Sequence, residues 1–214
     1  MKMKQGIIFD MDGTLWDSAK NVADSWTQVV QREYDKNRVI TEREIQSVMG
    51  KTMDRIAELL FGELAKEEQT TLLTHCCEAE NDYLRIHGGI LYPALEETMK
   101  KLQGSYHLYI VSNCQSGYIE AFLEHYGFAE YFEDIECFGN NGLDKGTNIR
   151  GLVERNGLDK AVYVGDIQGD YDASRKAGVK FIHAAYGFGT INEPVPKIHA
   201  LSELPDVAEQ VFSE

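Results

Sequence analysis

The chain of 214 residues is 43% apolar, which suits one domain with an insertion or two small domains. Its formal net charge of −14 leaves no basic face for a polyanion, so we expect neither nucleic acid nor an anionic membrane as a partner. No apolar stretch reaches the roughly 18 residues that a membrane-spanning helix needs, and we expect a cytoplasmic protein.

The first predicted strand is followed by a long helical stretch. The strand is the apolar run Gly6–Phe9, and residues 17–89 then show amphipathic helical patterns without a strand-like run. The helices are predicted at Ala19–Tyr34, Glu42–Val48, Met53–Phe61 and Glu67–Ile86. Small or flexible residues at both crossings, Ser18 and Gly88 among them, can form a hinge. We therefore expect a mobile helical cap (17–89) on a core of residues 1–16 and 90–214, with two rigidly packed domains as the alternative.

The rest of the chain alternates between short β-branched or aromatic runs and helical patterns. Strands are predicted at His107–Val111, Asp134–Cys137, Ala161–Val164 and Lys180–His183. Helices are predicted at Ala94–Gln103, Ser116–Tyr126, Asn148–Asn156 and Asp170–Ala177, each followed within a few residues by a glycine that can end it. This alternation predicts an α/β fold with a doubly wound parallel sheet.

Polar residues stand where three of the predicted strands end. Asp10, Ser112 and Asp166 each follow the last apolar residues of a strand. Because the carboxyl ends of parallel strands meet at one edge of the sheet, these distant segments are expected to form one site. Any one of them alone could be a helix cap, but that role does not explain all three.

The first of these ends carries two acidic residues in the sequence Asp-Met-Asp-Gly-Thr. Asp10 and Asp12 lie so close that a positive charge between them is expected. Asp166 and Asp170 add two carboxylates from a later segment, and such oxygen donors suit Mg²⁺. An EF-hand is excluded, because neither Asp10 nor Asp166 begins a loop with Gly at its sixth and Glu at its twelfth position.

The Asp-x-Asp-x-Thr pattern of residues 10–14 resembles the first motif of the haloacid dehalogenase superfamily of aspartate-nucleophile phosphotransferases. Ser112-Asn113 resembles the second motif, Lys145 the motif lysine, and Gly165-Asp166-x-x-x-Asp170 the acidic motif. The similarity runs from Phe9 to about Gly189 and is greatest to phosphoglycolate-phosphatase-like members with a helical cap. One departure is Gly146, since many relatives have proline after the motif lysine.

The resemblance implies a role for each residue of these motifs. Asp10 is implied as the nucleophile that forms an aspartyl-phosphate, and Asp12 as the group that protonates the leaving alkoxide and later takes a proton from water. Asp12 places the chain with the phosphate-ester branch, because the dehalogenase branch lacks an Asp there. Lys145 is implied to pair with Asp10 and the phosphate, although Asp144 beside it keeps an ordinary surface lysine open as an alternative.

The resemblance also implies the groups around the phosphoryl oxygens and the metal. Gly13, Thr14, Ser112 and Asn113 are expected to hold the phosphate. Mg²⁺ is expected to be bound by Asp10, the Asp12 carbonyl and Asp166, with Asp170 close by or linked through water. In the cap, Lys51 and Arg55 lie where similar proteins have a specificity loop and could meet an anionic substrate group; solvated charges at a helix end are the alternative.

Together these residues predict a magnesium-dependent phosphatase that hydrolyses a small phosphorylated metabolite, phosphoglycolate-like or a sugar phosphate. Two alternatives remain: a phosphomutase that uses the same intermediate, and a non-catalytic domain that binds phosphate. Retention of Asp10, Asp12, Lys145 and Asp166 disfavours the second alternative. The sequence indicates neither the physiological substrate nor the oligomeric state.

Overall fold

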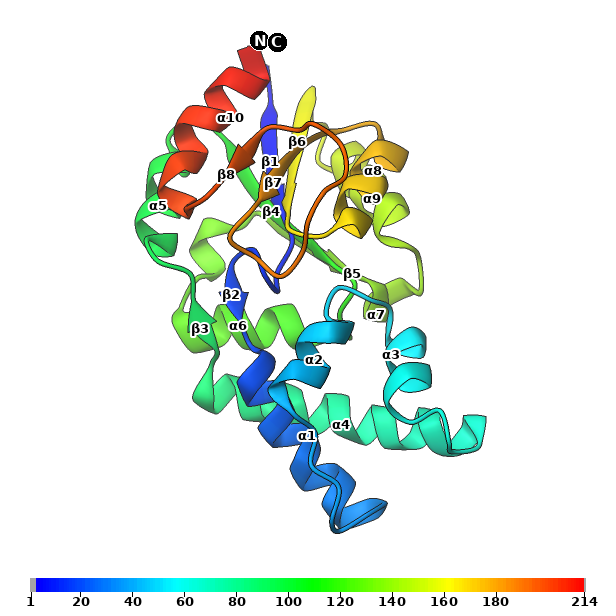
Figure 1. The fold of residues 1–214 in the computed structure, drawn as a ribbon. Coiled ribbons are helices and arrows are strands. Elements are labelled where there is room, and N and C mark those ends of the chain that lie inside the picture. The colour runs from blue at the N-terminus through cyan, green and yellow to red at the C-terminus, as the bar shows by residue number, and fades with distance from the viewer. Residues whose placement is uncertain (1–2, 214) are drawn as a thin grey trace.

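A computed structural model describes residues 3–213, and within them a six-stranded parallel sheet forms the centre of the molecule. The strand order is β5-β4-β1-β6-β7-β8. The strands are β1 (Gln5–Phe9), β4 (His107–Ser112), β5 (Asp134–Cys137), β6 (Lys160–Gly165), β7 (Lys180–Ala184) and β8 (Lys197–Ile198). Helices α5 (Leu95–Gln103) and α10 (Leu204–Ser213) lie on one side of the sheet, and α8 (Lys145–Arg155) and α9 (Gln168–Ala177) lie on the other (Figure 1). The predicted doubly wound α/β fold is confirmed.

The central strand β1 explains both the apolar runs and the position of the site. Ile7 and Phe9 belong to one hydrophobic core and Ile8 to the other, because alternate side chains of a strand face opposite sides of the sheet. β1 lies between β4 and β6, with Phe9 paired to Ile110 and to Val164. The chain continues on one side through β4 and β5 and on the other through β6 to β8. Asp10 therefore follows β1 at the point where the strand order reverses, which is where such sheets bind ligands.

Four helices are inserted after the first strand, as predicted. They are α1 (Ala19–Glu33), α2 (Glu42–Val48), α3 (Met53–Leu60) and α4 (Lys66–His87), and we call them the helical insert. The insert leaves and rejoins the core through a two-stranded antiparallel ribbon, β2 (Trp16–Asp17) with β3 (Ile90–Leu91), which was not predicted. Helix α4 packs against α1 and against α6 (Tyr118–Tyr126) of the core (Figure 1).

The return crossing of the insert is packed and hydrogen bonded. The Asn21 amide donates to the Gly88 carbonyl at 2.7 Å, and the Tyr126 hydroxyl donates to the Gly89 carbonyl at 2.7 Å. A Cβ atom on Gly89 would lie 2.9 Å from the Trp16 ring. Glycine is thus required there for close approach, in addition to the flexibility that the sequence predicts.

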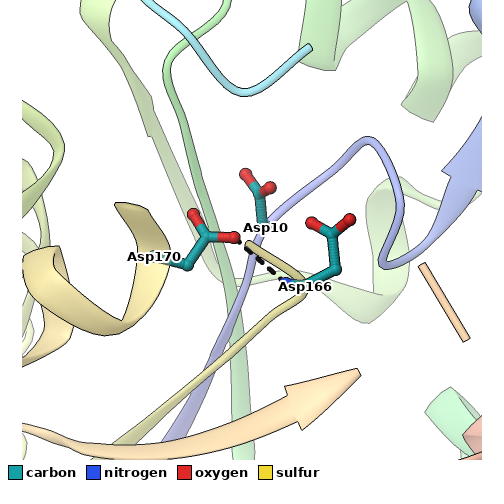
Figure 2. A group of neighbouring side chains, drawn as sticks. All are labelled: Asp10, Asp166 and Asp170. Carbon is teal, nitrogen blue, oxygen red and sulfur yellow. Dashed lines mark hydrogen bonds between the residues drawn. The ribbon is translucent and has the colours of Figure 1, made fainter. Parts of the chain in front are cut away.

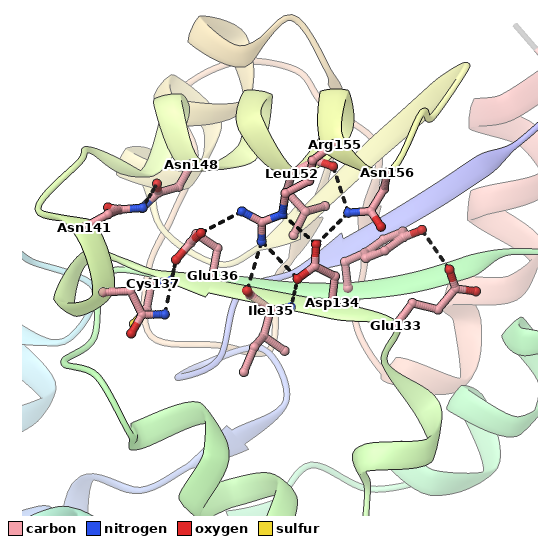
Figure 3. A network of polar contacts seen from close by, with 12 residues as sticks. Glu133, Asp134, Ile135, Glu136, Cys137, Asn141, Asn148, Leu152, Arg155 and Asn156 are labelled. Atoms are coloured by element: carbon pink, nitrogen blue, oxygen red, sulfur yellow. Dashed lines mark hydrogen bonds and ion pairs between the residues drawn. The ribbon is translucent and has the colours of Figure 1, made fainter.

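The edge strand β5 is fixed to α8 by one arginine. Arg155, the last residue of α8, bonds Asp134 through Nε at 2.7 Å and Glu136 through Nη1 at 2.7 Å (Figure 3). The same guanidinium donates to the Ile135 carbonyl at 3.1 Å. These contacts hold the C-terminal end of α8, whose first residue is Lys145.

The remaining short elements and the C-terminal helix were not predicted. They are η1 (Ala129–Tyr131), α7 (Phe138–Asn141), β8, η2 (Leu201–Glu203) and α10. Among the described residues, no helix has the length and apolar character needed to cross a membrane.

Candidate active site

Three buried carboxylates meet beyond the carboxyl ends of β1 and β6. Oxygens of Asp10, Asp166 and Asp170 lie within 4.8 Å of one another, and the three residues are at most 2% exposed (Figure 2). Asp170 lies in the first turn of α9, where its Oδ2 accepts from the backbone N–H of Asp166 at 3.0 Å and of Ile167 at 3.2 Å. The start of α9 therefore fixes the position of the loop that carries Asp166.

Lys145 supplies the positive charge of this cluster. Its Nζ donates to Asp10 Oδ1 at 2.8 Å and to Asp170 Oδ1 at 2.6 Å, and its side chain is 3% exposed. The alternative of a surface lysine is excluded by this burial. Neighbouring Asp144 caps α8 instead, accepting from the Thr147 N–H and pairing with Lys176 at 2.9 Å.

The glycine after Lys145, which departs from the pattern of many relatives, has a packing reason. A Cβ atom on Gly146 would lie 3.0 Å from the Ala173 carbonyl and 3.0 Å from Cδ of Lys176, both on α9. Glycine therefore lets α8 approach α9 closely. That approach brings Lys145 to Asp170.

The cluster carries more negative charge than one lysine balances. Burial, and then the charge of Asp170, raises the pKa of Asp10 to about 7, although Lys145 opposes this shift. Burial and the charges of Asp170 and Asp10 raise the pKa of Asp166 to about 8. Burial alone would lower the pKa of Lys145, but Asp10 and Asp170 together raise it above its ordinary value. The site is thus short of positive charge, and a divalent cation would supply it.

The turn after Asp10 brings its backbone very close to Asp166. Gly13 has φ +81°, and a Cβ atom there would lie 2.1 Å from Asp166 Oδ2. A Cβ atom on Gly187 would lie 2.3 Å from the Gly13 carbonyl oxygen. Two glycines thus let main chain approach the carboxylate cluster, a position that no other residue type could take without displacing Asp166.

The phosphate-binding roles expected for Gly13 and Thr14 stay predictions. The N–H groups of Gly13 and Thr14 donate within the turn, to Trp16 O at 3.0 Å and to Met11 O at 3.1 Å. The Thr14 hydroxyl, in contrast, is buried and has no hydrogen-bond partner within residues 3–213. A buried hydroxyl without a partner is costly, and a bound phosphoryl oxygen could satisfy it.

Asp12 has surroundings different from those of Asp10. Its Oδ1 accepts hydrogen bonds from Ser18 Oγ at 2.8 Å and from the Tyr118 hydroxyl at 2.7 Å, and these two hydroxyls lie 2.7 Å apart. Desolvation raises the pKa of Asp12 to about 6, while the bonds from Tyr118 and Ser18 oppose the rise. A carboxyl group with a pKa near neutrality can both donate and accept a proton at pH 7.

The second predicted motif connects the core to the insert. Ser112 ends β4 and is 5% exposed, and the Asn113 amide donates to the Gly50 carbonyl of the insert at 2.9 Å. The Asn113 Oδ1 atom is buried and has no partner among the described residues. A Cβ atom on Gly50 would lie 2.5 Å from the Ile167 side chain of the core. The loop around Gly50 therefore lies directly against the core beside the carboxylates.

The two basic residues of the insert are placed differently. Lys51 lines a cavity between the insert and the core, together with Asp12, Ser112 and Asn113. Arg55 is not among the lining residues and pairs with Glu58 on its own helix at 2.8 Å. The structure therefore brings Lys51 to the site and leaves Arg55 apart from it.

Two residues near the site were missed in the sequence. Tyr118 lies six residues after Ser112, just beyond a strand end already assigned to the site, so its proximity to the motif was the available signal. Glu80 was identifiable as a charged residue within the apolar stripe of α4, whose other buried members include Leu73, Cys77 and Leu84.

The chain has clear relatives. The sequence profile of the family described as haloacid dehalogenase-like hydrolase matches residues 7–184. The chain belongs to this family.

Phosphoglycolate phosphatases are among the proteins to which the chain is similar. A phosphoglycolate phosphatase of Vibrio vulnificus (strain CMCP6) is 27% identical over 222 residues, and the match covers 94% of both chains. One from Aquifex aeolicus (strain VF5) is 25% identical, with 89% of each chain covered.

Solved structures show the same fold. A predicted phosphatase from Clostridium acetobutylicum superimposes with a TM-score of 0.78 at 21% identity, covering 98% of this chain and 100% of that one. A CbbY variant from Rhodobacter sphaeroides, solved with xylulose-(1,5)bisphosphate, superimposes with a TM-score of 0.76 at 18% identity, covering 94% and 96%. At these identities the likeness concerns the fold alone.

Proposed function

We propose that this haloacid dehalogenase-like hydrolase is a magnesium-dependent phosphatase that cleaves a small phosphate monoester through an aspartyl-phosphate on Asp10. The observation that carries the proposal is the buried group formed by Asp10, Lys145, Asp166 and Asp170 at the reversal of strand order. The phosphoglycolate phosphatase relatives support a small phosphorylated metabolite, phosphoglycolate-like or a sugar phosphate, as the substrate.

In the first half of the reaction, a carboxylate oxygen of Asp10 attacks phosphorus and the ester P–O bond breaks. Lys145, 2.8 Å from Asp10 Oδ1, favours the ionised form of the nucleophile. Asp12 enters this step protonated and gives its proton to the leaving alkoxide, so that an alcohol departs. Asp10 then carries the phosphoryl group.

In the second half, water attacks the phosphoryl group. Asp12, now a carboxylate, takes a proton from this water while the bond between phosphorus and the Asp10 oxygen breaks. Inorganic phosphate leaves, and both aspartates regain their starting protonation states. The different surroundings of the two carboxyls support this division: Lys145 contacts Asp10, whereas neutral hydroxyls contact Asp12.

The donor set fits Mg²⁺. Oxygens of Asp10 and Asp166 would hold the ion with the Asp12 carbonyl, and Asp170 would stand behind them, since both of its oxygens already accept hydrogen bonds. Bound there, the ion supplies charge neutralisation for the approach of an anionic phosphate to carboxylates.

We further propose that the helical insert acts as a cap, with the domain division at residues 17 and 89. The β2–β3 ribbon at the crossings and the contact of Gly50 with the core support this role. A cap closed over the site would exclude bulk water while the ester is cleaved.

The test is turnover of a panel of small phosphate esters with Mg²⁺ and with excess chelator, for the wild type and for Asp10→Asn. Of these two proteins, we expect turnover only for the wild type with metal. With a ³²P-labelled phosphoester, we expect the label to be found on Asp10. Asp206→Asn, an exposed change on α10, serves as the matched control and should be fully active. Label on another residue would overturn the nucleophile assignment. Transfer to a sugar would indicate a mutase, and absence of turnover a binding domain.

A further inference from the structure

A small cavity connects Asp12 to the interior of the helical insert. It has a free volume of about 50 Å³ and is lined from the core by Asp12, Ser112 and Tyr118. The insert contributes Trp26 and Glu80 together with mainly aliphatic and methionine side chains. Because a water molecule needs about 10–15 Å³ measured in this way, the cavity has room for roughly three to five non-hydrogen atoms. That is the size of a short alcohol on the leaving side of a phosphate ester.

Glu80 is the unusual residue of this cavity. It lies on α4 at a position that is 4% exposed, among apolar neighbours. The Trp26 indole N–H donates to its Oε2, and Gln115 lines the same cavity. Within residues 3–213, no ion pair joins Glu80 to a basic side chain. Burial raises its pKa to about 8. A buried carboxyl without a counter-ion is costly to stability, so packing alone does not account for it.

The charges around the cavity disfavour an anionic leaving group. Asp12 and Glu80 both line it, and among its described lining residues Lys51 has the one positively charged side chain. The ammonium of Lys51 donates to the Ser47 carbonyl at 2.9 Å, at an exposed position. Above its pKa, where Glu80 is ionised, a carboxylate in this cavity would face a second buried negative charge, whereas a hydroxyl or an ammonium could donate a hydrogen bond to Glu80.

We infer that Glu80 selects the substrate: the leaving group is a short alcohol whose far end donates a hydrogen bond to Glu80 and carries no negative charge. This inference rests on the proposed phosphatase function and narrows its substrate class. It places hydroxyalkyl or aminoalkyl phosphates ahead of phosphoglycolate, although the named relatives are phosphoglycolate phosphatases. Glu80 is accordingly a specificity-determining residue that contacts the part of the substrate away from phosphorus.

The test uses four esters of nearly equal size at pH 9, where Glu80 is ionised: 2-hydroxyethyl phosphate, phosphoethanolamine, phosphoglycolate and ethyl phosphate. The first two carry a hydrogen-bond donor at the far end of the leaving group. For the wild type, we expect kcat/KM of at least one of these two esters to exceed that of phosphoglycolate by about tenfold or more, which is about 1.4 kcal/mol. Whether the hydroxyl or the ammonium ester is faster identifies the donor. Phosphoglycolate as the best of the four would overturn the inference.

The matched variants are Glu80→Gln in the cavity and Glu78→Gln, an exposed change on the same helix. Glu80→Gln keeps the shape and adds an N–H donor, so it should raise kcat/KM for phosphoglycolate and lower it for phosphoethanolamine, leaving ethyl phosphate nearly unchanged. Glu78→Gln should behave as wild type.

A purely structural role of Glu80 would instead change all four esters by the same factor, and that result would overturn the inference. Should Glu80→Gln fail to fold, as judged by circular dichroism, the wild-type ranking decides. Absence of turnover on every ester, including p-nitrophenyl phosphate, would overturn the proposed function itself. A wrong ranking with turnover would overturn only the inference.

Discussion

The Tyr118 hydroxyl donates a 2.7 Å hydrogen bond to Asp12 Oδ1, although 106 residues separate the two. Tyr118 begins α6 directly beyond β4, and Asp12 lies in the turn after β1, so the adjacency of these two strands brings them together. Ser18, at the start of the insert, bonds the same oxygen. A residue of the core and a residue of the crossing thus orient one carboxyl, and Tyr118 is a positioning residue for the proposed acid and base.

Tyr118→Phe should slow turnover of an alkyl phosphate by about 10–100-fold, because a hydrogen bond to a charged group contributes about 1.5–3 kcal/mol. The effect on p-nitrophenyl phosphate should be smaller in the first half-reaction, since its leaving group needs little protonation. Pre-steady-state release of nitrophenolate measures that step. Tyr171→Phe, whose ring packs on Phe181, is the control and should change neither rate. Equal losses on both substrates would indicate a general structural effect.

The sequence was sufficient for those parts of the fold that depend on local patterns. The strands and the helices of the insert followed from periodicity, and the glycines marked helix ends. The meeting of Asp10, Ser112 and Asp166 followed from one topological rule for parallel sheets. Lys145 needed the resemblance to a family, because nothing in the local sequence distinguishes a buried lysine from a surface one.

What could not be predicted depends on docking between distant segments. The β2–β3 ribbon pairs Trp16 with Leu91 over two residues per strand, too short a run for any periodicity. The approach of Tyr118 to Asp12 depends on how α6 packs against α4 of the insert (Figure 1). Glu80 was visible as a charge in an apolar stripe, but only the packing of α1 against α4 shows that Trp26 is its partner.

Asp12→Asn separates a phosphatase from a protein that only binds phosphate. The amide keeps the shape and the backbone carbonyl but can neither give nor take a proton, so steady-state turnover of alkyl phosphates should fall by about 10²–10⁴-fold. With p-nitrophenyl phosphate, the phosphorylated Asp10 should form faster than it is hydrolysed and should accumulate. Mass spectrometry of acid-quenched enzyme measures the adduct. Unchanged rates on an alkyl phosphate would mean that Asp12 is only a structural neighbour.

The metal-free protein should lose stability as pH rises. The pKa values of Asp10 and Asp166 are raised in the folded state to about 7 and about 8, from 3.8, and that of Glu80 to about 8, from 4.5. Between about pH 4 and pH 8 the folded state therefore holds protons that the unfolded state has released. The free energy of unfolding should fall across this window, by up to about 1.4 kcal/mol per pH unit for each proton retained. Urea denaturation in chelator at pH 5, 6, 7 and 8 measures the slope.

Two changes, the addition of Mg²⁺ and the substitution Glu80→Gln, separate the contributions of the individual carboxyls to this dependence of stability on pH. Mg²⁺ should flatten the part due to Asp10 and Asp166, because a bound cation favours their ionised forms. Glu80→Gln should remove the part due to Glu80 and stabilise the protein most at pH 8, while Asp12, whose pKa is raised to about 6, keeps its own contribution at lower pH. Stability that rises with pH in chelator would contradict the assignment of raised pKa values to these buried carboxyls.

Lys51 and Arg55 were predicted together as substrate-binding residues of the insert, and their surroundings now separate them. Lys51 lines the cavity beside Asp12, whereas Arg55 pairs with Glu58 on an exposed face.

Lys51→Ala should therefore lower kcat/KM for small alkyl phosphates by about 3–10-fold. The loss should be smaller at high salt, because salt screens the attraction between the exposed ammonium and the phosphate dianion. The loss on p-nitrophenyl phosphate should be smaller, since its aromatic ring exceeds the cavity of about 50 Å³ that Lys51 lines. Arg55→Ala should equal wild type on both substrates, and a loss there as large as that of Lys51→Ala would show that the insert binds its substrate in another arrangement.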